Sequence, residues 1–295
     1  MSITDCVSLR DAYAYICQST VHDGDEVMPR GYVTRELQGV TIALTDLPNA
    51  MPIGCGRDLK PEIGAAEALL LCGGIASPSL LISTSPAFKR FLDGGQLHGA
   101  YGPRVRGQLP RVVERLQRDP DSRQAFVTLW DPAYDQDDTR DLPCTTTFNF
   151  HIRNGALVMH SHMRSQDVFL GLPYDCWFFG QLGMTVARAL GLPPEDTTLI
   201  HHVDSFHAYE RNFEAITKLH AYDPDKVAGA EMNLPAGGVF GFGNGDGPFD
   251  IRDLMSRARS IYNLEQVADS SASELWYTHY LSQFDRLTAR ENFTS

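Results

Sequence analysis

The clearest pattern of hydrophobic and polar positions along the chain is an alternation around residue 150. Residues 146–152 and 156–164 both alternate with a period of two, and Arg153-Asn154-Gly155 separates them. Alternation is typical of a strand with one buried face, and Asn-Gly favours the type I′ turn that joins antiparallel strands. The sequence therefore predicts a central β-hairpin.

Apolar residues recur at helical spacing in other segments. The segment 61–72 begins at a proline and ends before two glycines, and the segment 176–190 ends before Gly191. These are typical helix boundaries. Strands and helices alternate without a regular βαβ order, which predicts one α+β domain over residues 1–295. We also expect helices at 8–22, 79–92 (broken near Pro86), 109–118, 209–219 and 271–291, strands at 40–47, 125–130 and 197–203, and a glycine-rich loop at 237–247.

The charge and the length of the apolar runs argue against two classes of partner, nucleic acids and membranes. The formal net charge is −12, whereas surfaces that bind nucleic acids are normally basic, so we do not expect a nucleic-acid partner. No apolar run approaches the roughly 20 residues that span a bilayer, and the N-terminus lacks the features of a secretory signal. We therefore expect no membrane partner and a cytoplasmic location, or the host cytoplasm if the protein is viral.

One of the six cysteines stands out by its position. The chain contains no Cys-x-x-Cys pair, so we expect neither a disulfide framework nor a cysteine-ligated metal. Cys144 follows Pro143 and comes directly before the first hairpin strand. A thiolate there is a candidate nucleophile, and the alternative is a buried structural cysteine. The residue alone leaves both interpretations open.

Two further positions have a functional and a structural interpretation. Arg164 and Ser165 offer a planar fork and a hydroxyl at the end of the second hairpin strand, which suits a phosphate. A surface arginine at a strand end would show the same pattern. Asp175 precedes the apolar helix at 176–190, where it has the position of an ordinary N-cap.

Histidines gather between residues 201 and 209. His207 and Tyr209 lie two positions apart, so on an extended segment they would share one face and could hold a sugar hydroxyl. The histidines at 201, 202 and 207 with Asp204 also suggest a metal, but their spacing matches no common ligand motif. We therefore expect no bound metal.

Several motifs follow one another in a fixed order that resembles the thymidylate synthase family. The resemblance is densest over residues 120–215 and thinner upstream, and we cannot align the chain with the family past residue 220. The motifs are Leu142-Pro143-Cys144, Phe148-Asn149-Phe150, Arg164-Ser165-x-Asp167-x-x-Leu170-Gly171-x-Pro173-Tyr174 and Asp204-x-x-His207-x-Tyr209, with Pro29-Arg30-Gly31, residues 63–67, Tyr101-Gly102 and residues 119–123 upstream.

The resemblance implies a fold and a reaction. The fold is a large mixed β-sheet flanked by helices, in a homodimer packed through the sheets. The reaction moves a one-carbon group from 5,10-methylenetetrahydrofolate to C5 of a pyrimidine nucleotide. Cys144 would add to C6 of the base, while Glu67 and Tyr101 would assist the proton transfers.

The resemblance also implies binding roles at the matching positions. Arg30, Arg164 and Ser165 would bind the phosphate, together with Arg123 reaching over from the partner subunit. His207 and Tyr209 would bind the sugar hydroxyl. Asp167 and Gly171 would bind the folate.

One departure from the family pattern concerns the base. In thymidylate synthases the position of Asp175 is an asparagine, which donates to O4 and accepts from N3–H of uracil. A carboxyl group accepts from the N4 amino group of cytosine, and a proton shared with N3 completes the second bond. Asp175 therefore favours cytosine. The same substitution is found in the deoxycytidylate hydroxymethylase branch of the family.

A second departure concerns the product. No tryptophan lies between Glu67 and Tyr101, where the synthases carry one beside the methylene group that receives a hydride. Without it, water can add to the methylene group, which gives a hydroxymethyl product and unoxidised tetrahydrofolate. The sequence thus predicts an enzyme that converts dCMP to 5-hydroxymethyl-dCMP, with Asp175 reading the base.

Three alternatives remain open at this point. A CMP 5-hydroxymethylase of a nucleoside-antibiotic pathway would differ only in the sugar that it accepts. A thymidylate synthase that methylates dUMP would produce dihydrofolate. A catalytically idle nucleotide or RNA binder would keep the fold without using Cys144 as a nucleophile.

Overall fold

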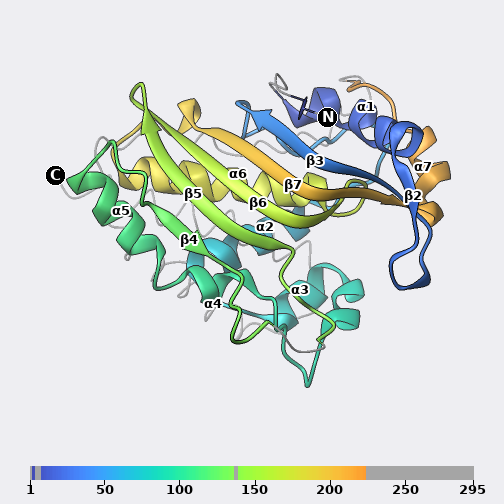
Figure 1. Ribbon diagram of the computed structural model, residues 1–295, viewed down its shortest axis with the longest axis horizontal. Helices are drawn as coiled ribbons and strands as arrows, with labels where there is room; N and C mark the ends of the chain where they lie inside the picture. Colours follow the sequence, from blue (N-terminus) through green and yellow to red (C-terminus); the bar gives the residue numbers. More distant parts are fainter. Residues whose placement is uncertain (1, 4–7, 136–138, 224–295) are drawn as a thin grey trace, which may run out of the picture.

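A seven-stranded mixed β-sheet forms the centre of the fold (Figure 1). The structure, a computed structural model, describes residues 2–3, 8–135 and 139–223. The predicted combination of a mixed sheet and flanking helices is confirmed. The strands follow one another across the sheet in the order β1 (Ser2–Ile3), β3 (Thr34–Leu44), β7 (Thr198–Tyr209), β6 (Ala156–Asp167), β5 (Thr145–Arg153) and β4 (Phe126–Thr128), and β2 (Asp25–Val27) pairs with β3.

The predicted hairpin is the pair β5–β6. The two strands are antiparallel from Thr145 to the turn. Asn154 and Gly155 have φ angles of 53° and 79°, both positive, as a type I′ turn requires. Strand β6 then pairs with β7 in parallel, so the chain crosses over the sheet between them.

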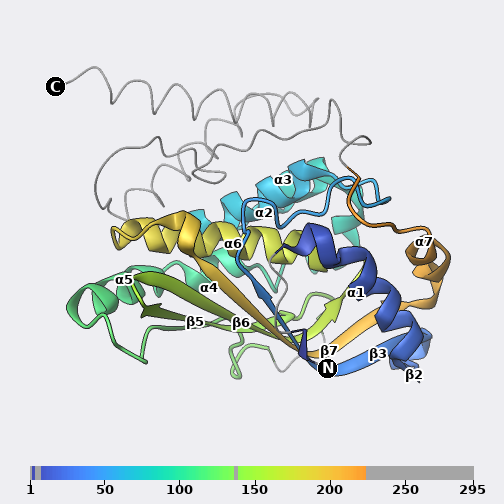
Figure 2. The same ribbon diagram turned by 90° about the horizontal axis from the view of Figure 1, so that it is seen from above.

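Helix α1 (Leu9–Asp23) and the crossover helix α6 (Leu172–Ala189) lie on one face of the sheet, and α2 (Pro61–Gly73) packs on the outer side of α6 (Figure 2). Helix α6 is buried along nearly its whole length, because it lies between the strands and α2. Gly64 of α2 permits this close packing, since a Cβ there would lie 3.0 Å from the Trp177 ring.

Smaller helices complete the described chain. None of its helices is long and apolar enough to cross a bilayer. They are α3 (Pro78–Thr84), α4 (Tyr101–Val105), α5 (Leu109–Arg118) and α7 (Phe213–Thr217), with 3₁₀ turns at Pro29–Gly31, Pro86–Phe91, Pro194–Asp196 and Glu210–Asn212.

Most predicted elements are confirmed, and two boundaries are wrong. The long apolar helix begins at Leu172 with Gly171 as its N-cap, so Asp175 lies inside the first turn and is not the N-cap. The helix predicted from 209 is a strand end there, because Tyr209 pairs with Thr34 of β3, and sheet pairing outweighs local propensity. The segments predicted at 237–247 and 271–291 lie outside the described residues.

The opposite face of strands β5 to β7 carries no described helix (Figure 2). Three histidines lie close together on these strands. His160, His162 and His202 have ring nitrogens within 4.8 Å of one another. Their rings are stacked within 16° of parallel, and His160 Nδ1 lies 3.0 Å from His202 Nε2. In-plane lone pairs of nearly parallel rings do not converge on one point, so this arrangement differs from a tetrahedral metal site.

Candidate active site

Cys144 lies at the entrance to strand β5. Its carbonyl oxygen accepts a hydrogen bond of 2.9 Å from the backbone N–H of Arg164 on β6, which fixes the segment before the strand. The other described cysteines, at 17, 55, 72 and 176, are buried, whereas Cys144 is partly exposed. This accessibility distinguishes Cys144 from the structural cysteines, as a nucleophile requires.

The Arg164 guanidinium donates hydrogen bonds to the segment that precedes Cys144. Its Nε donates to the Pro143 carbonyl at 2.9 Å, and one Nη donates to the Leu142 carbonyl at 3.2 Å and lies 3.8 Å from Cys144 Sγ. Burial raises the pKa of the Cys144 thiol, while Arg164 and Arg30 oppose the rise. Because burial is the largest of these effects, the thiol is protonated at neutral pH in the protein alone.

Tyr101 lies against the nucleophile segment from helix α4. Its hydroxyl oxygen accepts hydrogen bonds from the backbone N–H and the hydroxyl of Thr145, at 3.1 and 3.0 Å. Burial raises the pKa of Tyr101, and the neighbouring Cys144 and Asp175 raise it further. The phenol therefore remains protonated and can donate a hydrogen bond into the site.

Two carboxyl groups meet in this region because α2 packs on α6. Burial raises the pKa of Glu67 well above its usual value, and the negative charge of Asp175 adds to the rise. Burial also raises the pKa of Asp175 to about 7, against the hydrogen bond from Gln166. Two such groups can hold and exchange a proton at neutral pH, which is the chemistry of a general acid and base.

Gln166 is a site residue that the sequence analysis missed. Its Nε2 donates to Asp175 Oδ2 at 2.7 Å. Gly171 leaves space for this bond, since a Cβ at that position would lie 2.7 Å from Gln166 Nε2 and 3.0 Å from Asp175 Oδ2. Uninterrupted alternation along β6 would place Gln166 on the open face, but the burial pattern shifts after Met163 and turns its side chain toward α6.

Asp167 and Gly171, the residues predicted to bind the folate, lie at the two ends of the turn that leads into α6. Asp167 Oδ1 accepts the backbone N–H groups of Phe169 and Leu170, at 2.9 and 2.8 Å, and the Asp167 carbonyl accepts from the N–H of Gly171 at 3.0 Å. Tyr13 donates to the Phe169 carbonyl at 2.9 Å from the side of α1. The turn is therefore rigidly held before any ligand binds.

His207 and Tyr209 lie together at the end of β7. Their rings are 5.1 Å apart and perpendicular, and His207 Nδ1 donates to the Ser205 carbonyl at 3.3 Å. Tyr209 contacts Tyr32, next to the exposed turn that carries Arg30. The charge of Arg30 also lowers the pKa of the Cys144 thiol. The structure therefore brings this arginine and the predicted sugar-binding pair to the same end of the sheet.

The structure separates one predicted residue from the others. Arg123 is exposed and precedes Ala125, whose carbonyl accepts from the N–H of Phe150. Phe150 lies six residues along β5 from Cys144, a distance of about 20 Å in a strand. Arg123 therefore does not reach Cys144 of its own chain.

The histidines considered for a metal are also separated. His201 is fully buried on the helix side of the sheet, where its Nδ1 lies 2.8 Å from Ser161 Oγ. His202 belongs to the stack on the open face, and His207 lies at the strand end. Strand alternation thus directs His201 and His202 to opposite faces.

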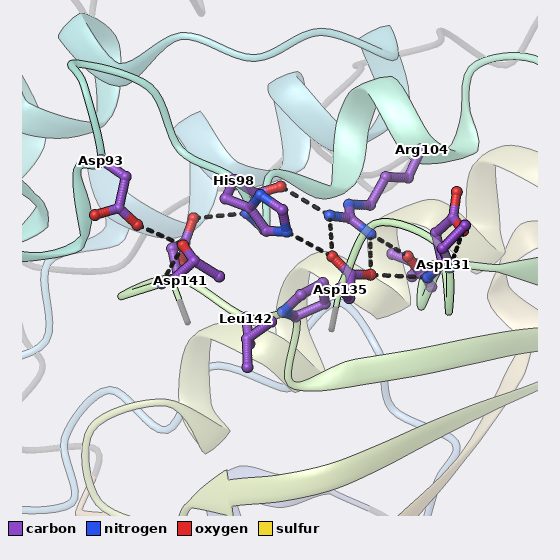
Figure 3. A network of polar contacts seen from close by, with 12 residues as sticks. Asp93, His98, Arg104, Asp131, Asp135, Asp141 and Leu142 are labelled. Carbon is purple, nitrogen blue, oxygen red and sulfur yellow. Dashed lines mark hydrogen bonds and ion pairs between the residues drawn. The ribbon is translucent and has the colours of Figure 1, made fainter. Parts of the chain in front are cut away.

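A buried ionic network supports the segment that leads to Cys144 (Figure 3). The Asp135 carboxylate, which has no exposed surface, receives two hydrogen bonds from Arg104, at 2.6 and 2.8 Å, and one from His98 at 2.7 Å. Burial alone would raise the pKa of Asp135, but these donors lower it to about 2. The carboxylate is therefore charged throughout the neutral range.

The same network reaches the nucleophile segment through Asp141 (Figure 3). Asp141 Oδ2 accepts the N–H of Gly99 at 2.8 Å. Gly99 follows His98, and Asp141 precedes Cys144 by three residues. The network therefore joins helix α4, which carries Tyr101, to the segment that carries the thiol.

In this fold, a cysteine lies near two carboxyl groups whose pKa values are raised. Comparison with known proteins identifies the family that has this fold. The thymidylate synthase family model matches residues 11–242, and the chain therefore belongs to the thymidylate synthase family. One relative is the deoxyuridylate hydroxymethyltransferase of Bacillus phage SP01, with 28% identity over 240 residues. The match covers 75% of this chain and 61% of the phage protein.

We predict that Asp135→Ala lowers the free energy of unfolding by about 3–5 kcal/mol, because it leaves the buried Arg104 without its partner. Urea unfolding measures the change. In the control, Glu26→Ala removes an exposed pair with Arg35 and should cost about 1 kcal/mol or less. Equal losses in the two variants would contradict a supporting role for the network.

Proposed function

We propose that this protein is a pyrimidine nucleotide 5-hydroxymethyltransferase that converts dCMP to 5-hydroxymethyl-dCMP. Its co-substrates are 5,10-methylenetetrahydrofolate and water. The observation that carries the proposal is the position of Asp175. Asp175 is half-buried, and its carboxyl group faces Glu67, Tyr101 and Cys144, where the thymidylate synthases have the asparagine that reads uracil.

The nucleophilic step would begin at Cys144. Its sulfur adds to C6 of the base, which makes C5 nucleophilic toward the methylene group of the folate. Arg164, 3.8 Å from the sulfur, would stabilise the developing thiolate and, with Ser165 and Arg30, would hold the phosphate. Tyr101 would assist as C5 loses its proton.

The second half of the reaction adds water. Hydroxide joins the exocyclic methylene group, and the sulfur then leaves C6. The C5 proton and one proton of water go to the two folate nitrogens, so tetrahydrofolate is released without oxidation. Glu67, whose pKa burial raises well above its usual value, is suited to pass these protons.

The tryptophans support addition of water rather than hydride transfer. None of the three lies between Glu67 and Tyr101. Trp177 is fully buried between α6 and α2, and Trp130 lines a concavity on the open face with Phe126 and Arg164. Trp276 lies outside the described residues.

The same proposal includes a homodimer. Phe126, 49% exposed, lies beside an open concavity of about 420 Å³ on the sheet face without described helices. A second subunit packed there would cover these residues. It would also bring its own Arg123 to the phosphate, which Arg123 does not reach within one chain.

A second candidate substrate is dUMP, in the same hydroxymethyl transfer. The phage relative is named for deoxyuridylate. The pKa of Asp175, about 7, also leaves much of this carboxyl group protonated at neutral pH, and a protonated carboxyl can donate to O4 of uracil. We favour dCMP because the ionised carboxylate accepts from the amino group of cytosine and repels O4.

The assay that tests the proposal is mass spectrometry of products from dCMP, CMP and dUMP, each with methylenetetrahydrofolate. We expect a hydroxymethyl group on dCMP and recovery of tetrahydrofolate. A hydroxymethyl product from CMP would mean that the substrate is a ribonucleotide. Hydroxymethyl-dUMP would mean that the base of the substrate is uracil. A methyl group on dUMP with dihydrofolate would identify a thymidylate synthase, and no product from any nucleotide would indicate a binder.

Asp175→Asn should shift the preference from dCMP toward dUMP by at least about tenfold, the scale of one buried hydrogen bond. The measurement is the ratio of kcat/KM values for the two nucleotides. Asp119→Asn makes the same chemical change at an exposed position and should leave the ratio unchanged. An unchanged ratio in Asp175→Asn would remove Asp175 from base selection.

Mixing the inactive variants Arg123→Ala and Cys144→Ala should restore activity if each site takes its arginine from the partner. Random exchange gives about a quarter of the wild-type sites, since only one site of each mixed dimer is intact. The mixture is assayed after subunit exchange, with each variant alone as the control. Failure to gain activity in demonstrated mixed dimers would contradict the shared site.

A further inference from the structure

A buried chain of hydrogen bonds runs from strand β6 through β7 to the base-reading carboxyl group. Ser161 Oγ lies 2.8 Å from His201 Nδ1, and His201 Nε2 lies 3.2 Å from Gln166 Oε1. Gln166 Nε2 then donates to Asp175 Oδ2 at 2.7 Å. Ser161 and His201 have no exposed surface and Gln166 has 2%, so water does not compete for these bonds.

The chemistry of each group fixes which atom donates and which accepts along this series of hydrogen bonds. Gln166 Oε1 only accepts, so His201 Nε2 must carry the proton and donate to it. His201 Nδ1 is then the acceptor of the Ser161 hydroxyl. Burial lowers the pKa of His201 to about 3, which keeps this ring neutral. The amide of Gln166 is therefore held with its donor toward Asp175.

We propose that Gln166, oriented by His201, holds Asp175 as a hydrogen-bond acceptor toward the base and so determines the preference for cytosine over uracil. This inference rests on the proposed function and names two positioning residues for it. Both residues are buried, and each would act on the base through Asp175.

The physical reason is that a hydrogen-bond donor favours the charged form of a carboxyl group. An ionised Asp175 accepts from the N4 amino group of cytosine, and N3 of cytosine is basic enough to hold the shared proton of the second bond, whereas O4 of uracil is not and is repelled. A neutral Asp175 donates to O4 of uracil or to N3 of cytosine, and so distinguishes the two bases poorly. The donor from Gln166 therefore favours cytosine whenever it increases the ionised fraction.

Burial outweighs the other effects on the pKa of Asp175 and places it near neutral pH, where the Gln166 donor changes the ionised fraction. Burial and the charge of Asp167 raise the pKa of Asp175, and Gln166 lowers it, with a result of about 7. Glu67, Tyr101 and Cys144 also face this carboxyl group. Without Gln166 the pKa of Asp175 would rise, so the neutral form would persist to higher pH.

The test compares Gln166→Leu with Gln117→Leu, which makes the same change on an exposed turn of α5. Dissociation constants for dCMP and dUMP are measured without folate, at pH about 6 and about 8. In the wild type the preference for dCMP should rise with pH as Asp175 ionises. Gln166→Leu should lower that preference about tenfold at the higher pH, and Gln117→Leu should not.

A second pair of variants tests the role of His201. His201→Gln keeps a donor toward Gln166 and should retain the pH-dependent preference, whereas His201→Leu should lose much of it. A purely structural role would weaken binding of both nucleotides equally and leave their ratio unchanged at each pH. That result in Gln166→Leu, with the fold confirmed by circular dichroism, would overturn the inference.

Binding without folate also separates this inference from the proposed function. A wild type that forms no hydroxymethyl product, but whose preference still changes with Gln166→Leu, would refute the function and keep the positioning role. A wild type that hydroxymethylates dCMP with an unchanged ratio in Gln166→Leu would keep the function and refute the positioning role.

Discussion

The close packing of α6 between the sheet and α2 is the constraint on which the site depends. Gly64 lets the two helices approach, and this approach brings the Glu67 and Asp175 carboxyl groups out of water together. Burying two like charges is costly, so at least one group takes a proton. The fold thus converts a packing contact into a proton-holding pair, and the same burial raises the pKa of Tyr101 and of the Cys144 thiol.

Rigidity around the site comes from backbone groups as much as from side chains. Arg164 binds two carbonyls of the nucleophile segment, and the Asp135 network joins that segment to the helix of Tyr101. The turn before α6 is closed by Asp167. A reacting pair needs positions accurate to a fraction of an ångström, and these contacts define such positions before a ligand arrives.

Local patterns predicted the elements whose determinants are local. Asn154-Gly155 specified the hairpin turn, and the proline at 61 and the glycines after 72 specified α2. The N-cap prediction for Asp175 was wrong because the helix begins one turn earlier. The helix predicted from 209 starts later, as a 3₁₀ turn at Glu210 and α7 at Phe213, because pairing with β3 extends the strand to Tyr209. Gln166 was missed because its direction depends on a change in strand alternation after Met163, and His201 was noticed but placed in the wrong group, since only the paired strands show which face it occupies.

The raised pKa of the Cys144 thiol has a consequence outside the reaction itself. Peroxide and other oxidants attack thiolates far faster than thiols, and a partly exposed low-pKa cysteine is the usual target of irreversible oxidation. Here burial keeps the sulfur protonated although it remains accessible. In the protein alone, the accessible sulfur of Cys144 is therefore held in the form that oxidants attack slowly.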